Sequence, residues 1–174
     1  ILETFPRDEL FQVGVDDLFD TTMGVLRLAE RARTRLFIRR DIFSRFYSCL
    51  IYLPRENYNT EVRIKLQEIL KRAFGGESVE FNVQLSESVL ARMHMLVRTS
   101  PATEQKFDLK ALEAEVVAAV RRWEEGVFER LVKQSGEDAA NVARRDFVLP
   151  FPAAYTEDTA PDQAVADFLA AKSI

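Results

Sequence analysis

The sequence predicts an α+β fold in which helices cover an antiparallel sheet. Two segments, Val79–Leu85 and Ala91–Val97, alternate apolar and polar residues, and the short polar turn 86–88 joins them as in a β-hairpin. The segment Phe46–Leu53 is almost wholly apolar, which is typical of a central strand that is covered on both faces. A helical pattern lies between this strand and the hairpin, so a helix alternates with strands along the chain.

Two helices in the first half are indicated by apolar residues spaced three and four positions apart. The first extends over about 16–33. Its apolar face consists of Leu18, Phe19, Thr22, Val25, Leu26 and Ala29. The second begins at Asn59 or Thr60, because either side chain can accept a hydrogen bond from a free amide of the first turn. Gly75-Gly76 supplies the left-handed residue that ends this helix.

The remaining elements are shorter or less regular, apart from one long helix predicted over 108–134. Before the first helix, the opening eleven residues are expected to be extended, with a break at Pro6. After the long helix, we expect a helical turn or two over 138–145 and a last short strand over 147–151. Pro161 is suited to the first turn of a final helix.

The order of these elements predicts a ferredoxin-like fold. A short strand, Leu36–Arg39, precedes the central strand. When the first helix and this short strand are set aside, the order is βαββαβ, an antiparallel sheet with both helices on one face. We therefore expect an extended piece and helix over 1–34, an α+β domain over 35–151 and a helical extension over 152–174.

Length and composition limit the class of protein. A chain of 174 residues with 47% apolar and 30% charged residues is typical of one globular domain. Its longest apolar run in the middle, Cys49–Leu53, is far shorter than a membrane span, and no signal peptide opens the chain. The missing initiator Met predicts a piece of a longer polypeptide. The single cysteine is suited to a reducing compartment, so we expect the cytoplasm.

Few residues have the character of catalytic groups or ligands. His94 is the single histidine and has no second cysteine or histidine with which to form a zinc site. Cys49 lies in the most apolar strand, as a core thiol does. Gly75-Gly76 lacks the context of a phosphate-binding or dinucleotide-binding loop, and it is explained as a helix stop. We predict no catalytic, cofactor-binding or metal-binding residue in this chain.

The formal net charge of −4 argues against a dedicated nucleic-acid binder, but the charge is uneven. Between Arg27 and Arg45, seven arginines and two carboxylates leave a local excess of +5. The candidate contact residues in and after this basic stretch are Arg39, Arg40, Asp41, Arg45, Arg55, Tyr58, Asn59 and Thr60. They form either an ion-pair network that holds loops or a neighbouring module, or a site in which arginines bind an anionic effector. RNA binding is a weaker alternative, because FSRFYSCLIYLP lacks the glycines of the RNA-recognition signature.

Three segments closely resemble a known family. They are ILETFPRDELF, RLFIRRDIFSRFYSCLIYLPRENYNTEVRIKLQEIL and AFGGESVEFNVQLSESVLARMHMLVRT. Together they resemble the N-terminal half of the long-chain bacterial NAD-specific glutamate dehydrogenases from Ile1 to Thr99, and the similarity continues weakly to FPAAYTED.

The resemblance implies a parent enzyme that converts L-glutamate, NAD and water to 2-oxoglutarate, ammonium and NADH. In that family the residues that bind NAD and glutamate lie in a later catalytic region, so this segment resembles one of the ACT-like modules before it. Such modules imply a regulatory or assembly role, contacts with other domains of the same polypeptide, a homo-oligomer and a possible amino-acid effector.

One departure from the family pattern concerns the effector. ACT domains that bind amino acids usually have a glycine in the loop between the first strand and the first helix, whereas 54–60 has none. This difference favours a packing role and leaves open a purely structural spacer that mediates subunit contacts.

Overall fold

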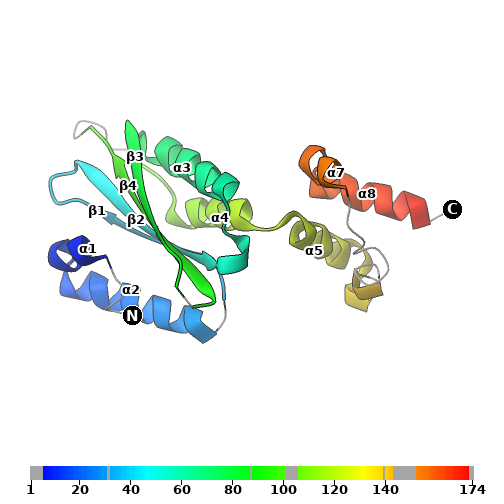
Figure 1. The fold of residues 1–174 in the computed structure, drawn as a ribbon, viewed down its shortest axis with the longest axis horizontal. Helices are drawn as coiled ribbons and strands as arrows, with labels where there is room; N and C mark the ends of the chain where they lie inside the picture. Colours follow the sequence, from blue (N-terminus) through cyan, green and yellow to red (C-terminus); the bar gives the residue numbers. More distant parts are fainter. Residues whose placement is uncertain are drawn as a thin grey trace. The chain divides into compact units, whose positions relative to one another are not determined.

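The computed structural model describes residues 6–30, 32–86, 88–100, 106–138, 140–142 and 152–172, which fall into two compact units, Ile1–Val120 and Arg121–Ile174 (Figure 1). The elements of the first unit are α1 (Arg7–Gln12), α2 (Val15–Glu30), β1 (Arg35–Arg40), β2 (Phe46–Pro54), the 3-10 turn η2 (Arg55–Asn57), α3 (Thr60–Phe74), β3 (Ser78–Gln84), β4 (Leu90–Arg98) and α4 (Leu109–Val120). Those of the second unit are α5 (Trp123–Ser135), α7 (Ala153–Asp158) and α8 (Pro161–Lys172).

The sheet of the first unit has four antiparallel strands in the order β1-β2-β4-β3. The predicted hairpin is confirmed as β3 and β4, and the apolar strand β2 is central, between β1 and β4. Its burial is almost continuous from Tyr47 to Leu53, because helices cover both faces of the sheet. The α+β class with a ferredoxin-like antiparallel sheet is therefore confirmed.

One edge of this sheet differs from the prediction. The short strand that lies outside the predicted βαββαβ order, β1, pairs with β2 from Arg35↔Tyr52 to Arg40↔Tyr47, so it fills the position next to the central strand. The tight turn 41–45 makes this possible because it returns the chain directly alongside itself. The predicted last strand, 147–151, lies outside the described residues. The chain order around the sheet is thus ββαββα.

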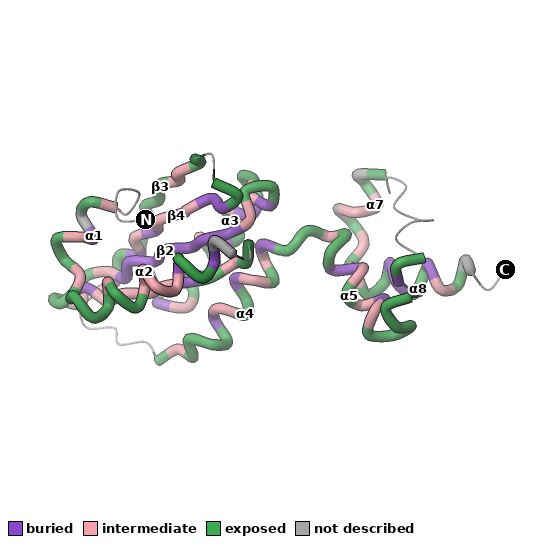
Figure 2. Tube along the Cα trace, turned by 90° about the horizontal axis from the view of Figure 1, so that it is seen from below, coloured by how far each residue is buried: buried purple, intermediate pink, exposed green. Residues whose placement is uncertain are grey.

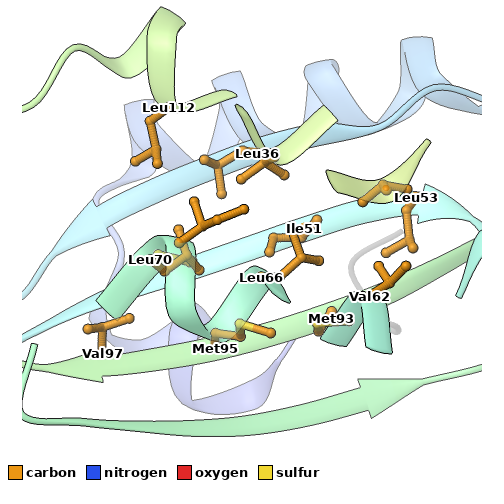
Figure 3. Packing of buried hydrophobic residues seen from close by; sticks show 14 of the residues in the cluster. Leu36, Ile51, Leu53, Val62, Leu66, Leu70, Met93, Met95, Val97 and Leu112 are labelled. Atoms are coloured by element: carbon orange, nitrogen blue, oxygen red, sulfur yellow. The ribbon is translucent and has the colours of Figure 1, made fainter. Parts of the chain in front are cut away.

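The main core lies between the sheet and the pair α3 and α4. Figure 3 shows apolar side chains of the strands and of α3 pointing toward one another, among them Ile51, Leu66, Leu70, Met93 and Met95. All five are fully buried. Burial of one such side chain contributes about 1.5–3 kcal/mol, so this layer stabilises the unit strongly.

Helix α3 begins and ends where the sequence predicts. The Asn59 side chain accepts a hydrogen bond from the Val62 amide at 2.8 Å, and Gly75 adopts φ 60°, ψ 38° after the last turn. Gly76 is needed for a different reason: a Cβ atom there would lie 2.4 Å from Cγ1 of buried Val97. The glycine pair therefore both stops the helix and lets the chain pass close to β4.

The opposite face of the sheet is covered by α1 and α2 (Figure 1). Val25 and Leu28 of α2 pack on Leu50, Tyr52 and Leu90 of the sheet. Figure 2 shows the resulting buried stripe along β2.

Two predictions about this N-terminal layer are wrong. Arg7–Gln12 is helical, not extended, because Pro6 supplies a fixed backbone angle that suits the residue before a helix, and its carbonyl accepts from the amides of Glu9 and Leu10. The predicted apolar face of α2 is also divided, since Phe19 and Leu26 are exposed.

The predicted helix over 108–134 is wrong as a single element. It is two helices, α4 and α5, separated by Arg121 and Arg122. Arg122 has extended backbone angles, and its amide donates to the Glu125 carboxylate at 3.4 Å, which caps the start of α5. The apolar stripe runs across the break, but Leu112, Val116 and Val120 belong to the sheet core, whereas Val127 and Leu131 belong to a second core.

The second unit is helical in its described part. Val127 and Leu131 of α5 pack with Val165 and Phe168 of α8, and the Trp123 indole donates to the Thr159 carbonyl at 2.7 Å. The final helix begins at Pro161, as predicted. The helical turns expected over 138–145 are present at 137–138 and 140–142, and the rest of that segment lies outside the described residues.

Candidate functional site

A buried carboxylate, Glu9, connects α1 to the sheet. Its two oxygens accept hydrogen bonds from Arg39 of β1, at 2.9 Å from Nε and 2.8 Å from Nη2. Both side chains are largely removed from solvent. A bidentate arginine–carboxylate pair has a fixed geometry, so this contact sets where α1 lies on the sheet.

Two further polar side chains complete a cluster around this carboxylate. The Ser48 hydroxyl and His94 Nε2 lie 2.9 Å apart, and His94 Nε2 is 3.6 Å from Glu9 Oε1. Ser48 faces Arg39 across the β1–β2 pair, so neighbouring strands deliver all three sheet residues to one face. We call Glu9, Arg39, Ser48 and His94 the Glu9 cluster.

The electrostatics of the Glu9 cluster favour the ionised carboxylate. Burial alone would raise the pKa of Glu9, but the hydrogen bonds from His94, Arg39 and Ser48 outweigh it and hold the pKa at about 2. Near neutral pH the carboxylate is therefore ionised, and the hydrogen bonds from its partners offset the cost of its burial.

The Glu9 cluster contains the residue types of a catalytic triad, but their geometry is different. In a triad the histidine contacts the nucleophile with one ring nitrogen and the carboxylate with the other. Here both Ser48 and Glu9 lie nearest to the same nitrogen, Nε2, and Ser48 is buried. The arrangement orders a helix against a sheet and has no path for proton relay through the ring.

The β1–β2 turn holds three more of the predicted site residues. The buried Asp41 carboxylate accepts from Arg45 Nε at 3.0 Å and from the amides of Phe43 and Arg45 at 3.3 Å. The hydrogen bond from the Arg45 side chain is the main reason that the pKa of Asp41 is lowered. Arg40 lies over the Tyr47 ring, 5.7 Å from its centroid. These charges stabilise the turn.

The other four predicted residues lie at the far end of β2. Arg55 donates to the Ser86 carbonyl at 2.9 Å, which ties η2 to the loop after β3. Asn59 caps α3, Thr60 is its first residue, and Tyr58 is partly buried against the main core.

The eight predicted residues therefore form two groups. Strand β2 has nine residues and separates the groups by about 26 Å, at roughly 3.3 Å per residue. No small ligand can contact both groups at once.

Glu9 was missed because nothing local marks it. It is one of several acidic residues near the start of the chain, and its partner Arg39 lies thirty positions away. The contact between α1 and β1 can be recognised only in the folded structure, where the two elements lie next to each other. His94, in contrast, lies where strand alternation predicts, on the face opposite Met93 and Met95.

Arg92 is a charged residue of the same sheet face with a different environment. Its Nε and Nη1 atoms are buried, and within the described residues they have no hydrogen-bond partner. Burial lowers the pKa of Arg92, and its cross-strand neighbour Tyr52 opposes that effect. On this face Arg39 thus has a bidentate partner, whereas two of the three guanidinium nitrogens of Arg92 have none among the described residues.

Other reactive groups are shielded or scattered. Burial raises the pKa of the Cys49 thiol far above its usual range. Among the residues that the structure describes, no three histidine, cysteine or acidic side chains are grouped so that they could hold a metal ion. In the same ranges, none of the helices is long and apolar enough to cross a membrane.

The four-stranded antiparallel sheet with paired helices defines an ACT-like module, flanked here by helical segments. The chain belongs to the glutamate dehydrogenase family, whose ACT2 domain model matches residues 35–124. The models for helical motif 1 and helical motif 2 of glutamate dehydrogenase match residues 1–31 and 130–171.

Similar proteins carry the same name in three bacteria. The chain is 41% identical over 167 residues to NAD-specific glutamate dehydrogenases of Halomonas elongata and Pseudomonas aeruginosa, which is 96% of this chain and 10% of each relative. It is 30% identical over 182 residues to the NAD-specific glutamate dehydrogenase of Mycobacterium tuberculosis, covering 96% of this chain and 11% of that relative. The chain thus spans about a tenth of the length of these relatives.

Proposed function

We propose that this chain is a non-catalytic assembly and regulatory module of an NAD-specific glutamate dehydrogenase. The whole enzyme would convert L-glutamate, NAD and water to 2-oxoglutarate, ammonium and NADH, with NAD bound outside this segment. The family match and the names of the relatives support the parent activity. The observation that supports the role of the module is that its predicted site residues make contacts within the module itself.

The contacts of these residues favour assembly over effector binding. Arg39 is held by Glu9, Asp41 by the amides of its own turn, and Asn59 by the first turn of α3. The Arg39–Glu9 pair fixes α1 against β1, and the other two interactions stabilise the β1–β2 turn and the start of α3. A rigid body of this kind is suited to position neighbouring domains and to form subunit contacts in a homo-oligomer.

The first test is a turnover measurement. The purified 174-residue chain, supplied with glutamate and NAD, should form no NADH above the rate of a boiled sample. The full-length enzyme with residues 35–120 deleted should be compared with the intact enzyme for oligomeric state by mass photometry. Turnover by the isolated chain would contradict the proposal, and an unchanged oligomer and unchanged kinetics in the deletion would contradict an assembly role.

An amino-acid effector site is the second candidate, and Arg55 is the residue that favours it. Its side chain is exposed, and a single described hydrogen bond, from Nη1 to Ser86, engages it. Isothermal titration calorimetry with a panel of amino acids should give binding heat that Arg55→Ala abolishes if the site exists. Arg40→Ala, at the other end of β2, is the matched control. No heat across the panel supports the structural spacer.

The cytoplasm is the proposed compartment, because a free buried cysteine and an NAD-dependent parent are suited to it. Thiol trapping of the parent enzyme in intact cells, followed by mass spectrometry, tests this: Cys49 should be recovered as a reduced thiol after denaturation.

A further inference from the structure

The turn between β1 and β2 exposes two large apolar side chains side by side. Ile42 is 81% exposed and Phe43 is 63% exposed. Turn residues are more often polar, and adjacent exposed apolar residues in a soluble module mark a contact surface. We call Ile42 and Phe43 the apolar tip.

The backbone beneath the apolar tip is held by hydrogen bonds on its inner side. The Asp41 amide donates to the Phe46 carbonyl at 2.9 Å, and the Ser44 amide donates to the Asp41 carbonyl at 2.8 Å. The buried Asp41 carboxylate accepts two more amides from the same turn, those of Phe43 and Arg45. Each central amide of the turn except that of Ile42 therefore has a described partner.

A second element fixes the turn from the side. The buried residue Thr99, just after β4, donates its amide to the Arg45 carbonyl at 2.9 Å. Its hydroxyl donates to the Ser44 carbonyl at 3.4 Å. These contacts hold Ser44 at φ 58°, a conformation that non-glycine residues adopt at a cost of about 1 kcal/mol or more. The strained residue is thus locked by the sheet.

The consequence is a preorganised backbone that presents the two apolar side chains in fixed directions. The Arg45 guanidinium lies 4.9 Å from the centre of the Phe43 ring, which restricts the ring further. A group that is already ordered loses little entropy when it binds, so a rigid apolar tip binds more tightly than a flexible one of equal area. Aromatic residues fixed in this way are common anchors of interfaces.

The charges around the apolar tip define the chemistry of its partner. Arg45 is 61% exposed at its side chain although it contacts Asp41, so its outer face can meet a carboxylate. A surface that accepts the apolar tip should therefore be an apolar pocket with acidic residues at its rim.

We propose that the apolar tip inserts into such a pocket in another segment of the same polypeptide. This inference rests on the proposed function, because about nine-tenths of each relative's length lies outside the matched region. A twofold contact between two copies of the tip is disfavoured, since it would bring the exposed Arg45 of one copy close to that of the other.

A photocrosslinking experiment on the full-length polypeptide tests the proposal. A benzophenone amino acid replaces Phe43 in one sample and Val89 in another. Val89 is also 63% exposed and lies in the loop between β3 and β4, at the far end of β4, so it is a matched control. Protein labelled with ¹⁵N is mixed with unlabelled protein before assembly, so that cross-links between copies can be recognised by mass.

The expected result is one dominant cross-linked peptide from position 43, within a single polypeptide and from a segment that contains acidic and apolar residues. Position 89 should give no such peptide. Hybrid ¹⁴N–¹⁵N cross-links as the main product, or scattered products at position 43, would overturn the proposal. Turnover by the isolated chain would refute the proposed function by a separate readout, so the two failures can be told apart.

A double variant, Ile42→Ser with Phe43→Ser, provides the second measurement. Both side chains are exposed, so the isolated chain should keep its thermal midpoint within about 2 °C. In the full-length polypeptide the cross-linked segment should become at least several-fold faster in amide hydrogen exchange. Unchanged exchange in that segment would also overturn the proposal.

Discussion

Arg39 and Glu9 form a bidentate ion pair, with Nε–Oε2 and Nη2–Oε1 distances of 2.9 and 2.8 Å, between the edge strand β1 and the first helix. They are thirty positions apart in the chain, and the segment between them includes all of α2. The pair therefore holds α1, the first helix of the N-terminal layer, against the edge strand of the sheet.

Removal of the Glu9 charge should destabilise the module strongly. Glu9→Gln leaves a largely buried guanidinium without its counter-ion, which costs about 3 kcal/mol in the free energy of unfolding. Urea unfolding followed by circular dichroism measures this loss. The control is Glu80→Gln, which breaks the exposed pair Arg98–Glu80 and should change stability by less than about 1 kcal/mol. Equal effects of the two substitutions would contradict the role of the buried pair.

The same carboxylate should make stability depend on acid pH. The folded-state pKa of Glu9 is about 2, below its ordinary value of 4.5, so the unfolded chain binds the proton more readily. The contribution of Glu9 is therefore complete above pH 4.5 and is lost as pH falls from 4.5 toward 2. Unfolding free energies at pH 2.5, 3.5, 4.5 and 5.5 should show this slope, and Glu9→Gln should remove part of it. Identical slopes in both proteins would rule the linkage out.

The two guanidinium groups of this sheet face should respond oppositely to loss of charge. Arg92 has two buried guanidinium nitrogens, Nε and Nη1, without a partner in the described part of the chain, so Arg92→Met should raise the unfolding free energy by about 1 kcal/mol. Arg39→Met should lower it, because Glu9 would be left buried and unpaired. Thermal unfolding of the two variants in parallel provides the comparison. A destabilised Arg92→Met protein would show that this guanidinium has a favourable partner.

Gly76 should not tolerate a side chain. A Cβ atom would lie 2.4 Å from Val97 Cγ1, and Val97 is fully buried, so Gly76→Ala must displace β4 or α3. We expect a loss of about 1–3 kcal/mol, as in other overpacked cores. Gly14→Ala is the control, since its nearest neighbour would be Asp17 at 3.8 Å, an ordinary contact. Chemical denaturation of both variants measures the difference, and a neutral Gly76→Ala would refute the steric explanation.

The elements that depend on local pattern were predictable from sequence. The period of two in Val79–Leu85 and Ala91–Val97, the cap at Asn59 and the stop at Gly75-Gly76 depend on residues a few positions apart. The same holds for the continuous apolar run of β2.

Features that depend on distant partners were not predictable in this way. The break between α4 and α5 lies inside a continuous apolar stripe, and only the division of that stripe between two cores explains it. Strand β1 is short and charged at both ends, so its pattern gave little sign that it pairs along its full length with β2.

The candidate site was affected by the same limit. All eight predicted residues lie at the ends of β2 or in the adjoining elements, but proximity in sequence suggested one group, whereas an extended strand separates them into two. The exposure of Ile42 and Phe43 could not be predicted from the turn pattern, because it depends on whether another element of the fold covers the turn.

The complete burial of Cys49 makes the reactivity of its thiol a measure of how often the module opens. Its thiol lies on the central strand beneath α3 and α4, so a thiol reagent can reach it only when these helices separate from the sheet. The rate at which the single thiol is modified in native buffer therefore reports how often the whole core comes apart, and neighbouring domains that clamp the module should slow that rate.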